Sequence, residues 1–123
     1  MIALALIQLF VAQGAVPGAR TLSVTKDNAA SHFRIRVAKA GLVTMRFSEP
    51  LQAGGAGLSN GEIFSVQEAS AEQLNLSSKA NRAGDRATMT VITKGGLRLI
   101  FDLSCVEPAQ DADAFIDVQI NLR

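Results

Sequence analysis

The sequence predicts an all-β protein, an antiparallel β-sandwich of about seven or eight short strands. Two observations predict it. Apolar and polar residues alternate with a period of two in several separate runs, and clusters of Gly, Asn, Asp and Pro separate these runs at short intervals. A period of two gives each strand one dry and one wet face, which is typical of antiparallel sheet. The length of 123 residues suits a single domain.

The predicted strands follow one another along the chain with little sequence between them. Residues 33–37 and 43–47 alternate most regularly, and the turn at 38–41 predicts that they pair as a hairpin. Weaker strands are expected at 21–25, 62–68 and 73–77, although the last segment also contains good helix formers. Flexible loops are expected at 54–61, 81–85 and 107–113. The strands are expected to bury Phe33, Ile35, Val37, Val43, Met45, Phe47, Met89, Val91, Leu99, Phe101, Val118 and Ile120.

A second hairpin, around Lys94-Gly95-Gly96, can be read to the level of its register. A three-residue loop pairs Met89 with Phe101 and Val91 with Leu99, which makes one face almost wholly apolar. A two-residue loop would mix polar and apolar residues on both faces, so the three-residue loop is favoured. Gly96 then takes the left-handed position of such a loop. The same register leaves Ile92 and Ile100 on the outer face, either as ordinary surface residues or as part of a subunit contact.

The first residues have the character of an export signal. Residues 1–12 are nearly all apolar and too few to span a bilayer as a helix, but they have the length of a signal-peptide core. Ala12 and Gly14 have the spacing that signal peptidase accepts, while no Lys or Arg precedes the apolar run. We expect residues 1–14 to be a signal peptide and residues 15–123 to form one periplasmic, outer-membrane-associated or secreted domain. The alternative is that the leader is a buried strand or helix.

The residues that carry most enzyme and metal chemistry are scarce. His32 is the only histidine and Cys105 the only cysteine, so blue-copper and structural zinc sites are excluded. No Gly-x-Ser-x-Gly segment or phosphate-binding loop is present, and Asp111 and Asp113 are expected in a loop. The sequence therefore predicts no catalytic residue, no metal and no cofactor. The net charge of +1 and the absence of Trp and Tyr give no support to nucleic-acid binding.

Three groups of residues are candidates for contacts with partners. If residues 33–37 and 42–47 form a hairpin, then Arg34, Arg36 and Arg46 share one outward basic face. This face is either a solvated surface or an edge protected from aggregation by its charge, and the alternative is a contact with an acidic protein or lipid surface. If the run 115–122 lies at a sheet edge, its backbone could pair with a neighbouring chain. The candidate subunit-contact residues are Ile92, Ile100, Arg98, Phe115, Asp117 and Gln119. Two different contact patches would favour a head-to-tail association that closes into a ring.

The segment 87–103, ATMTVITKGGLRLIFDL, resembles a part of one known family. It is similar to the N-terminal β-sandwich domain of the outer-membrane core-complex protein of type IV secretion and conjugal transfer systems. The similarity extends to Val43-Thr44-Met45-Arg46-Phe47 and Ile63-Phe64-Ser65-Val66, and spans about residues 33–103. Thr88 and Leu99 depart from the family, which usually has Asn and Tyr there. A myxobacterial family of secreted β proteins shows a similar alternation.

This resemblance implies a non-catalytic structural subunit of a bacterial envelope secretion or conjugation complex. Its expected partners are other protein subunits of that complex, with no transmembrane span in the mature chain and with a homo-oligomer, such as a ring, as one arrangement. The alternative is a monomeric periplasmic or secreted module that binds a small ligand, peptide or glycan between the loops 54–61 and 81–85. The absence of Trp and Tyr favours the structural subunit, because such pockets often use these rings.

Overall fold

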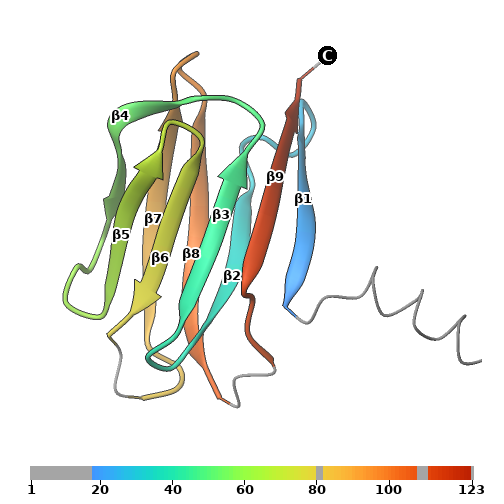
Figure 1. The fold of residues 1–123 in the computed structure, drawn as a ribbon. Coiled ribbons are helices and arrows are strands. Elements are labelled where there is room, and N and C mark those ends of the chain that lie inside the picture. Colours follow the sequence, from blue (N-terminus) through green and yellow to red (C-terminus); the bar gives the residue numbers. More distant parts are fainter. Residues whose placement is uncertain (1–17, 80–81, 108–110, 123) are drawn as a thin grey trace, which may run out of the picture.

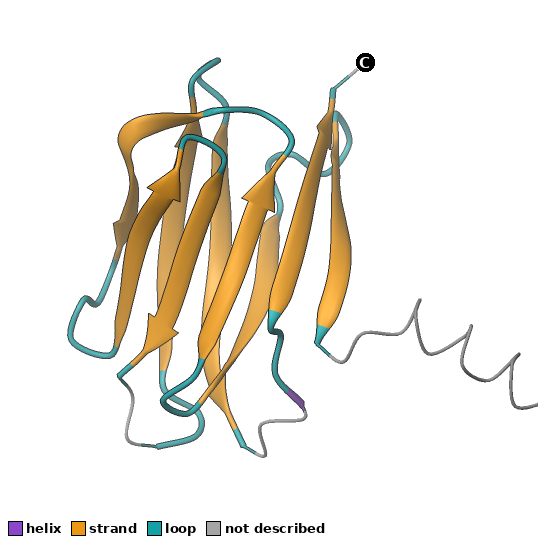
Figure 2. Cartoon of the chain, in the orientation of Figure 1, coloured by secondary structure: helices purple, strands orange, loops and turns teal. Residues whose placement is uncertain are grey.

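The computed structural model describes residues 18–79, 82–107 and 111–122, and these form two β-sheets packed face to face (Figure 1). Figure 2 shows that loops join the strands, with one short 3₁₀ turn at Asp111. The all-β sandwich is therefore confirmed. The predicted signal peptide, residues 1–14, lies outside the described residues. The strands are β1 (Ala19–Thr25), β2 (His32–Ala38), β3 (Leu42–Phe47), β4 (Leu51–Leu58), β5 (Phe64–Ser70), β6 (Gln73–Ser78), β7 (Arg86–Thr93), β8 (Arg98–Val106) and β9 (Phe115–Asn121).

Both sheets are mixed rather than wholly antiparallel. The five-stranded sheet has the order β1–β9–β3–β6–β5, and the four-stranded sheet has the order β2–β8–β7–β4. The pairs β1–β9, β3–β9 and β2–β8 are parallel, and the other pairs are antiparallel. Each parallel pair joins strands that are far apart in the sequence, so every one of them closes a long stretch of chain.

The prediction that residues 33–37 and 43–47 pair as a hairpin is wrong. Both segments are strands, but β2 lies in the four-stranded sheet and β3 in the five-stranded sheet. The turn between them carries the chain from one layer to the other, with Ala40 at φ 56° and a hydrogen bond from the Gly41 amide to the Ala38 carbonyl, 2.7 Å. A Cβ at Gly41 would lie 2.7 Å from the Ala38 Cβ, so this tight turn requires glycine.

The hairpin β7–β8 has the predicted register. Met89 pairs with Phe101, and Val91 pairs with Leu99. The amide of Thr93 donates to the Leu97 carbonyl, 2.8 Å, which closes the three-residue loop, and Gly96 has a φ of 95°. The left-handed position predicted for Gly96 is confirmed.

Three other segments differ from or refine the expectations. Residues 73–78 form strand β6 and no helix. The glycine-rich segment expected as a loop is largely strand β4, an edge strand whose register shifts between Leu51 and Ala56. Glycine weakens strand interiors, but it is common at such irregular edges. Strand β9 pairs on both sides, with β1 and with β3, so it lies inside its sheet and not at an edge.

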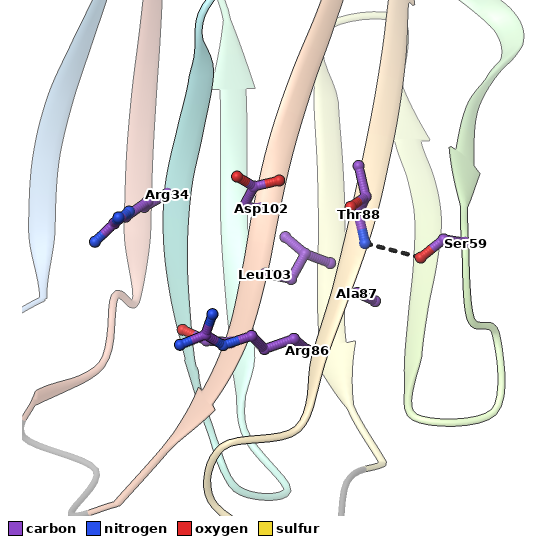
Figure 3. A pocket seen from close by; sticks show the side chains of 8 residues that line it. Arg34, Ser59, Arg86, Ala87, Thr88, Asp102 and Leu103 are labelled. Carbon is purple, nitrogen blue, oxygen red and sulfur yellow. Dashed lines mark hydrogen bonds between the residues drawn. The ribbon is translucent and has the colours of Figure 1, made fainter.

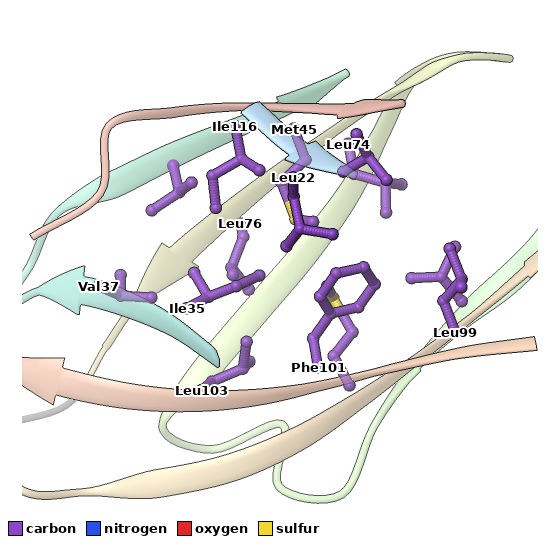
Figure 4. Packing of buried hydrophobic residues seen from close by; sticks show 14 of the residues in the cluster. Leu22, Ile35, Val37, Met45, Leu74, Leu76, Leu99, Phe101, Leu103 and Ile116 are labelled. Atoms are coloured by element: carbon purple, nitrogen blue, oxygen red, sulfur yellow. The ribbon is translucent and has the colours of Figure 1, made fainter. Parts of the chain in front are cut away.

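The core fills the space between the two sheets (Figure 4). Phe101 is fully buried at its centre, with ring centroids 5.8 Å from Phe33 and 6.3 Å from Phe47. Ten of the twelve predicted core residues are buried, and the other two, Phe33 and Ile120, are partly buried against the core. The alternation in the sequence therefore identified the inward faces correctly.

A buried carboxylate joins the sheets where β1 and β2 form neighbouring edges of the sandwich. Asp113 is 4% exposed. Its Oδ1 accepts a hydrogen bond from Arg20 Nε, 2.8 Å, and its Oδ2 accepts one from the Arg36 amide, 2.9 Å. Arg20 Nη2 also donates to the Arg34 carbonyl. These bonds occupy backbone groups on the free edge of β2, so they block further strand pairing there.

Candidate functional site

The outward face of the four-stranded sheet carries the most distinctive set of polar residues among the described parts of the chain. The pairing of β2 with β8 and of β8 with β7 shows which residues lie side by side across the three strands. His32 of β2 lies beside Ile100 of β8, which lies beside Thr90 of β7. In the next row the neighbours are Arg34, Asp102 and Thr88, and in the row after that they are Arg36, Ser104 and Arg86. All of these side chains point away from the core, because their neighbours along each strand are the inward residues.

This face is strongly basic. Its outward positions on β2, β7 and β8 hold four arginines, Arg34, Arg36, Arg86 and Arg98, against one carboxylate, Asp102. The whole chain has a net charge of only +1. The positive charge is therefore concentrated on one side of the sandwich, which the overall composition could not show. A local field of one sign favours anionic partners.

A shallow groove of about 470 Å³ lies within this face (Figure 3). It is lined by Arg34, Ser59, Arg86, Ala87, Thr88, Asp102, Leu103 and Ser104. Ser59 closes one side, because its hydroxyl accepts a hydrogen bond from the Thr88 amide, 2.9 Å. The groove is mainly a feature of the sheet surface. Of the two loops predicted to form a pocket, the loop 54–61 contributes Ser59 to the lining. The described part of the loop 81–85 does not line the groove itself, but Arg86, which follows it directly, does.

The two arginines of the groove have no acidic partner among the described residues. The ion pairs among the described residues are Arg20–Asp113, Arg36–Asp113 and Lys39–Glu107, and the Asp102 carboxylate lies against the His32 ring. Asp102 neighbours Arg34 across the strands, yet it pairs with His32, with Nδ1 to Oδ1 at 3.2 Å. The guanidinium groups of Arg34 and Arg86 therefore remain available to a ligand.

The His32–Asp102 pair deserves comparison with catalytic sites. A histidine held by a carboxylate is the orienting half of a nucleophilic triad. Both side chains are about half exposed, and no described serine or threonine hydroxyl hydrogen-bonds to the imidazole. Among the described residues the arrangement therefore lacks the nucleophile of a triad. His32 is the first residue of the edge strand β2.

The predicted contact residues divide between the two faces. Ile92, Ile100 and Arg98 lie with Arg34 and Arg36 on the outward side of the four-stranded sheet. Arg46 lies on β3, beside Asp117 of β9, so it is not part of the basic face and that part of the prediction is wrong. Arg86 takes its place. The error follows from the incorrect pairing of residues 33–37 with residues 43–47.

Phe115, Asp117 and Gln119 lie on the outward face of the five-stranded sheet. Because β9 is paired on both sides, strand addition at β9 is excluded. A different feature is present there. Phe115 is 36% exposed and lies beside Thr44, and Leu42, two residues before Thr44 on β3, is 56% exposed. The two side chains form a small apolar patch on the side of the sandwich opposite the basic face.

Sequence reasoning missed Arg86, Asp102, Thr88 and Ser104 as members of one site. The signal was present in the hairpin register, which already placed these residues on the outward face of β7 and β8. What was lacking was the position of β2 beside β8. Cys105 is buried, as expected for a small apolar residue. No group of three or more potential metal ligands occurs within residues 18–79, 82–107 and 111–122.

The chain matches no protein-family model and no curated protein. In the described part of the chain, no helix has the length and apolar character needed to cross a bilayer.

Proposed function

We propose that this chain is a non-catalytic structural subunit of a bacterial envelope secretion or conjugation complex, which binds neighbouring protein subunits. The observation that carries the proposal is the basic face, where Ile92 and Ile100 lie among four arginines and one aspartate. Protein contact surfaces are enriched in arginine and poor in carboxylates, and their buried centres are more apolar than the rest of the protein surface. The resemblance of residues 33–103 to a β-sandwich of such complexes supports the choice of this class.

Export to the periplasm or the outer membrane is part of the proposal. The support is the apolar leader followed by Ala12 and Gly14 at the spacing of a cleavage site. In this compartment the domain needs no disulfide, since the core between the two sheets is extensive and Cys105 is buried within it.

Two different outward surfaces support a head-to-tail arrangement. The isoleucines of the basic face and the patch of Leu42 and Phe115 lie on opposite sides of the sandwich. A contact between unlike surfaces is heterologous, so it closes into a ring when the rotation between copies allows it. This replaces the pairing of β9 with a neighbouring chain.

The test is assembly of the full chain, alone and together with the proteins encoded beside it. Light scattering measures the mass of the wild type, of the double variant Ile92→Ser/Ile100→Ser, and of a control, Leu122→Ser. Leu122 is an exposed aliphatic residue outside both surfaces. We expect the wild type and the control to assemble and the double variant to remain monomeric. A wild type that is monomeric under all conditions overturns the proposal, and equal assembly of all three proteins removes the basic face as the contact.

A second function has one observation in its favour. The groove on the basic face is the kind of concave feature that a monomeric periplasmic or secreted module needs for a small ligand or peptide. Its lining is polar, and the protein has no Trp or Tyr to stack on a sugar ring. A monomer that binds a small anion and no protein partner favours this function over the structural subunit.

A further inference from the structure

We propose that the groove between Arg34 and Arg86 binds the carboxylates of an acidic, extended segment of a partner protein. This inference deepens the proposed function and rests on it, because it names the chemistry of the partner at the same face. It depends on three features of the described residues: the position of the two arginines, their lack of an acidic partner, and the spacing of charges along β2.

The fold brings Arg34 and Arg86 together from distant parts of the sequence. Strand β8 lies between β2 and β7, so the backbones of Arg34 and Arg86 are two strand spacings apart, about 10 Å. They are also offset by two residues along the strands, about 7 Å, because Arg86 lies in the row of Arg36. Figure 3 shows the Arg86 side chain extended across β8 toward β2, Asp102 on β8 between Arg34 and Thr88, and the end of the Arg34 side chain directed away from β8 in this view. Thr88 and Ser104 add hydroxyl groups to the lining. A ligand in the groove therefore meets arginine side chains from two strands and hydroxyls between them.

The electrostatic balance of the groove favours a carboxylate. Asp102 is the only acidic residue in the lining, and it pairs with His32 instead of either arginine. A guanidinium group presents a planar set of donors that matches the two oxygens of a carboxylate, and such bonds are stronger than neutral ones. The lining therefore holds two arginines against one carboxylate, and a bound acidic side chain neutralises the remaining positive charge.

The spacing of the arginines points to an extended segment. Arg34 and Arg36 project from the same face of β2, and residues two apart on a strand are separated by about 7 Å. An extended peptide presents every second side chain on one side at the same interval. Acidic residues at alternate positions thus match the arginines of β2, while Arg86 approaches from the other side of the groove. Arg36 contributes less, since its Nη2 is already 3.9 Å from Asp113.

The rest of the face favours a protein over a nucleic acid or a membrane. Ile92 and Ile100 adjoin the basic groups, as at protein contacts. The outward positions of β2, β7 and β8 carry no aromatic side chain that could stack on a base. The face is also a sheet surface and not an amphipathic helix that could embed an apolar side in lipid.

The test measures fluorescence anisotropy with a labelled peptide in which Asp alternates with Thr. Its isomer with the same composition and all Asp residues contiguous is the peptide control. We expect the alternating peptide to bind more tightly than the isomer, and higher salt to weaken its binding. The variant Arg34→Glu/Arg86→Glu should lose at least about tenfold in affinity, because attraction becomes repulsion. The matched variant Arg46→Glu changes an exposed arginine on the other sheet and should stay within about twofold of the wild type.

A peptide with Lys in place of Asp gives the reciprocal measurement. It should bind the Arg34→Glu/Arg86→Glu variant and not the wild type, and a far-ultraviolet circular-dichroism spectrum like that of the wild type shows that the variant is folded. The inference is overturned if the wild type does not bind the alternating Asp peptide, or if Arg46→Glu weakens binding as much as the double variant. Tighter binding of oligo-dT, or of vesicles that contain phosphatidylserine, would overturn it as well.

Failure of this inference can be told apart from failure of the proposed function. Assembly is tested through Ile92 and Ile100, whereas peptide binding is tested through Arg34 and Arg86. If the protein assembles but does not bind the acidic peptide, the groove is not a peptide-binding site, and the proposal of a structural subunit is retained. If the protein binds the peptide but is monomeric under all conditions, the groove is a peptide-binding site, and the proposal of a structural subunit is refuted.

Discussion

Replacing Asp113 with alanine tests the inter-sheet ion pair at the edge of the sandwich. The Arg36 amide loses its acceptor, and an unsatisfied donor of this kind costs about 1–3 kcal/mol. Arg20 loses its bonds to Asp113, but its side chain is 36% exposed, so water replaces much of what it loses. The variant also no longer carries the cost of burying a carboxylate. We therefore expect Asp113→Ala to lower the free energy of unfolding by about 2–3 kcal/mol.

The assay is urea denaturation followed by far-ultraviolet circular dichroism, since the protein has no Trp or Tyr for fluorescence. Asp111→Ala is the matched control, because Asp111 is an exposed carboxylate two residues away. Arg20→Ala should be at least as damaging as Asp113→Ala, since it leaves the buried carboxylate without its main partner. The double variant should then cost less than the sum of the two. If Asp113→Ala stays within about 0.5 kcal/mol of the wild type, as Asp111→Ala should, the reasoning is refuted.

Three further predictions concern the core, one turn and the leader. Phe101→Ala should lower the free energy of unfolding by about 3–5 kcal/mol in the same urea assay, because the ring is fully buried against the rings of two other phenylalanines. A loss below about 1 kcal/mol would contradict this packing. Gly96→Ala should cost about 1 kcal/mol through backbone strain alone, since its φ is 95° and a Cβ would meet no atom within 4 Å. Gly61→Ala, also in open space but without a positive φ, should be neutral or slightly stabilising, and equal effects of the two changes would rule out strain at Gly96. N-terminal sequencing of the protein from a bacterial periplasm should find cleavage near Gly14, whereas an intact Met1 in protein from the cytoplasm would contradict export.

The sequence predicted the faces of the strands better than their neighbours. The alternation correctly predicts that Val43 and Met45 are buried while Arg46 is not. Every second side chain of a strand faces the core, so this pattern can be recognised from adjacent residues alone. The β7–β8 register followed from the same pattern, since one loop length made a whole face apolar. The alternation does not indicate which sheet a strand joins. For β2 and β3 the short turn suggested a hairpin, but the chain crosses between layers there, and β2 instead pairs with β8.

The candidate site was predicted only in part for the same reason. Arg34 and Arg36 were placed on an outward face, but Arg86 becomes their neighbour only because β2 lies in parallel beside β8. Asp113 is a similar case. In the sequence it is one of two aspartates in a loop, and its burial depends on the approach of Arg20 and Arg36, residues 93 and 77 positions away. No local pattern carries such information.

The position of β9 inside its sheet, between β1 and β3, also determines the order in which the molecule can fold. Residues 115–121 lie between β1 and β3, so until they are in place β1 has no partner in its sheet. The antiparallel pairs β5–β6 and β7–β8 join neighbouring segments and can form early, whereas β1–β9 and β2–β8 must close long stretches of chain. Such non-local pairing places folding in the millisecond-to-second range typical of sandwiches. A chain emerging from the ribosome therefore stays incomplete until its ninth strand has been made, and its N-terminal strand remains open to other proteins during that interval.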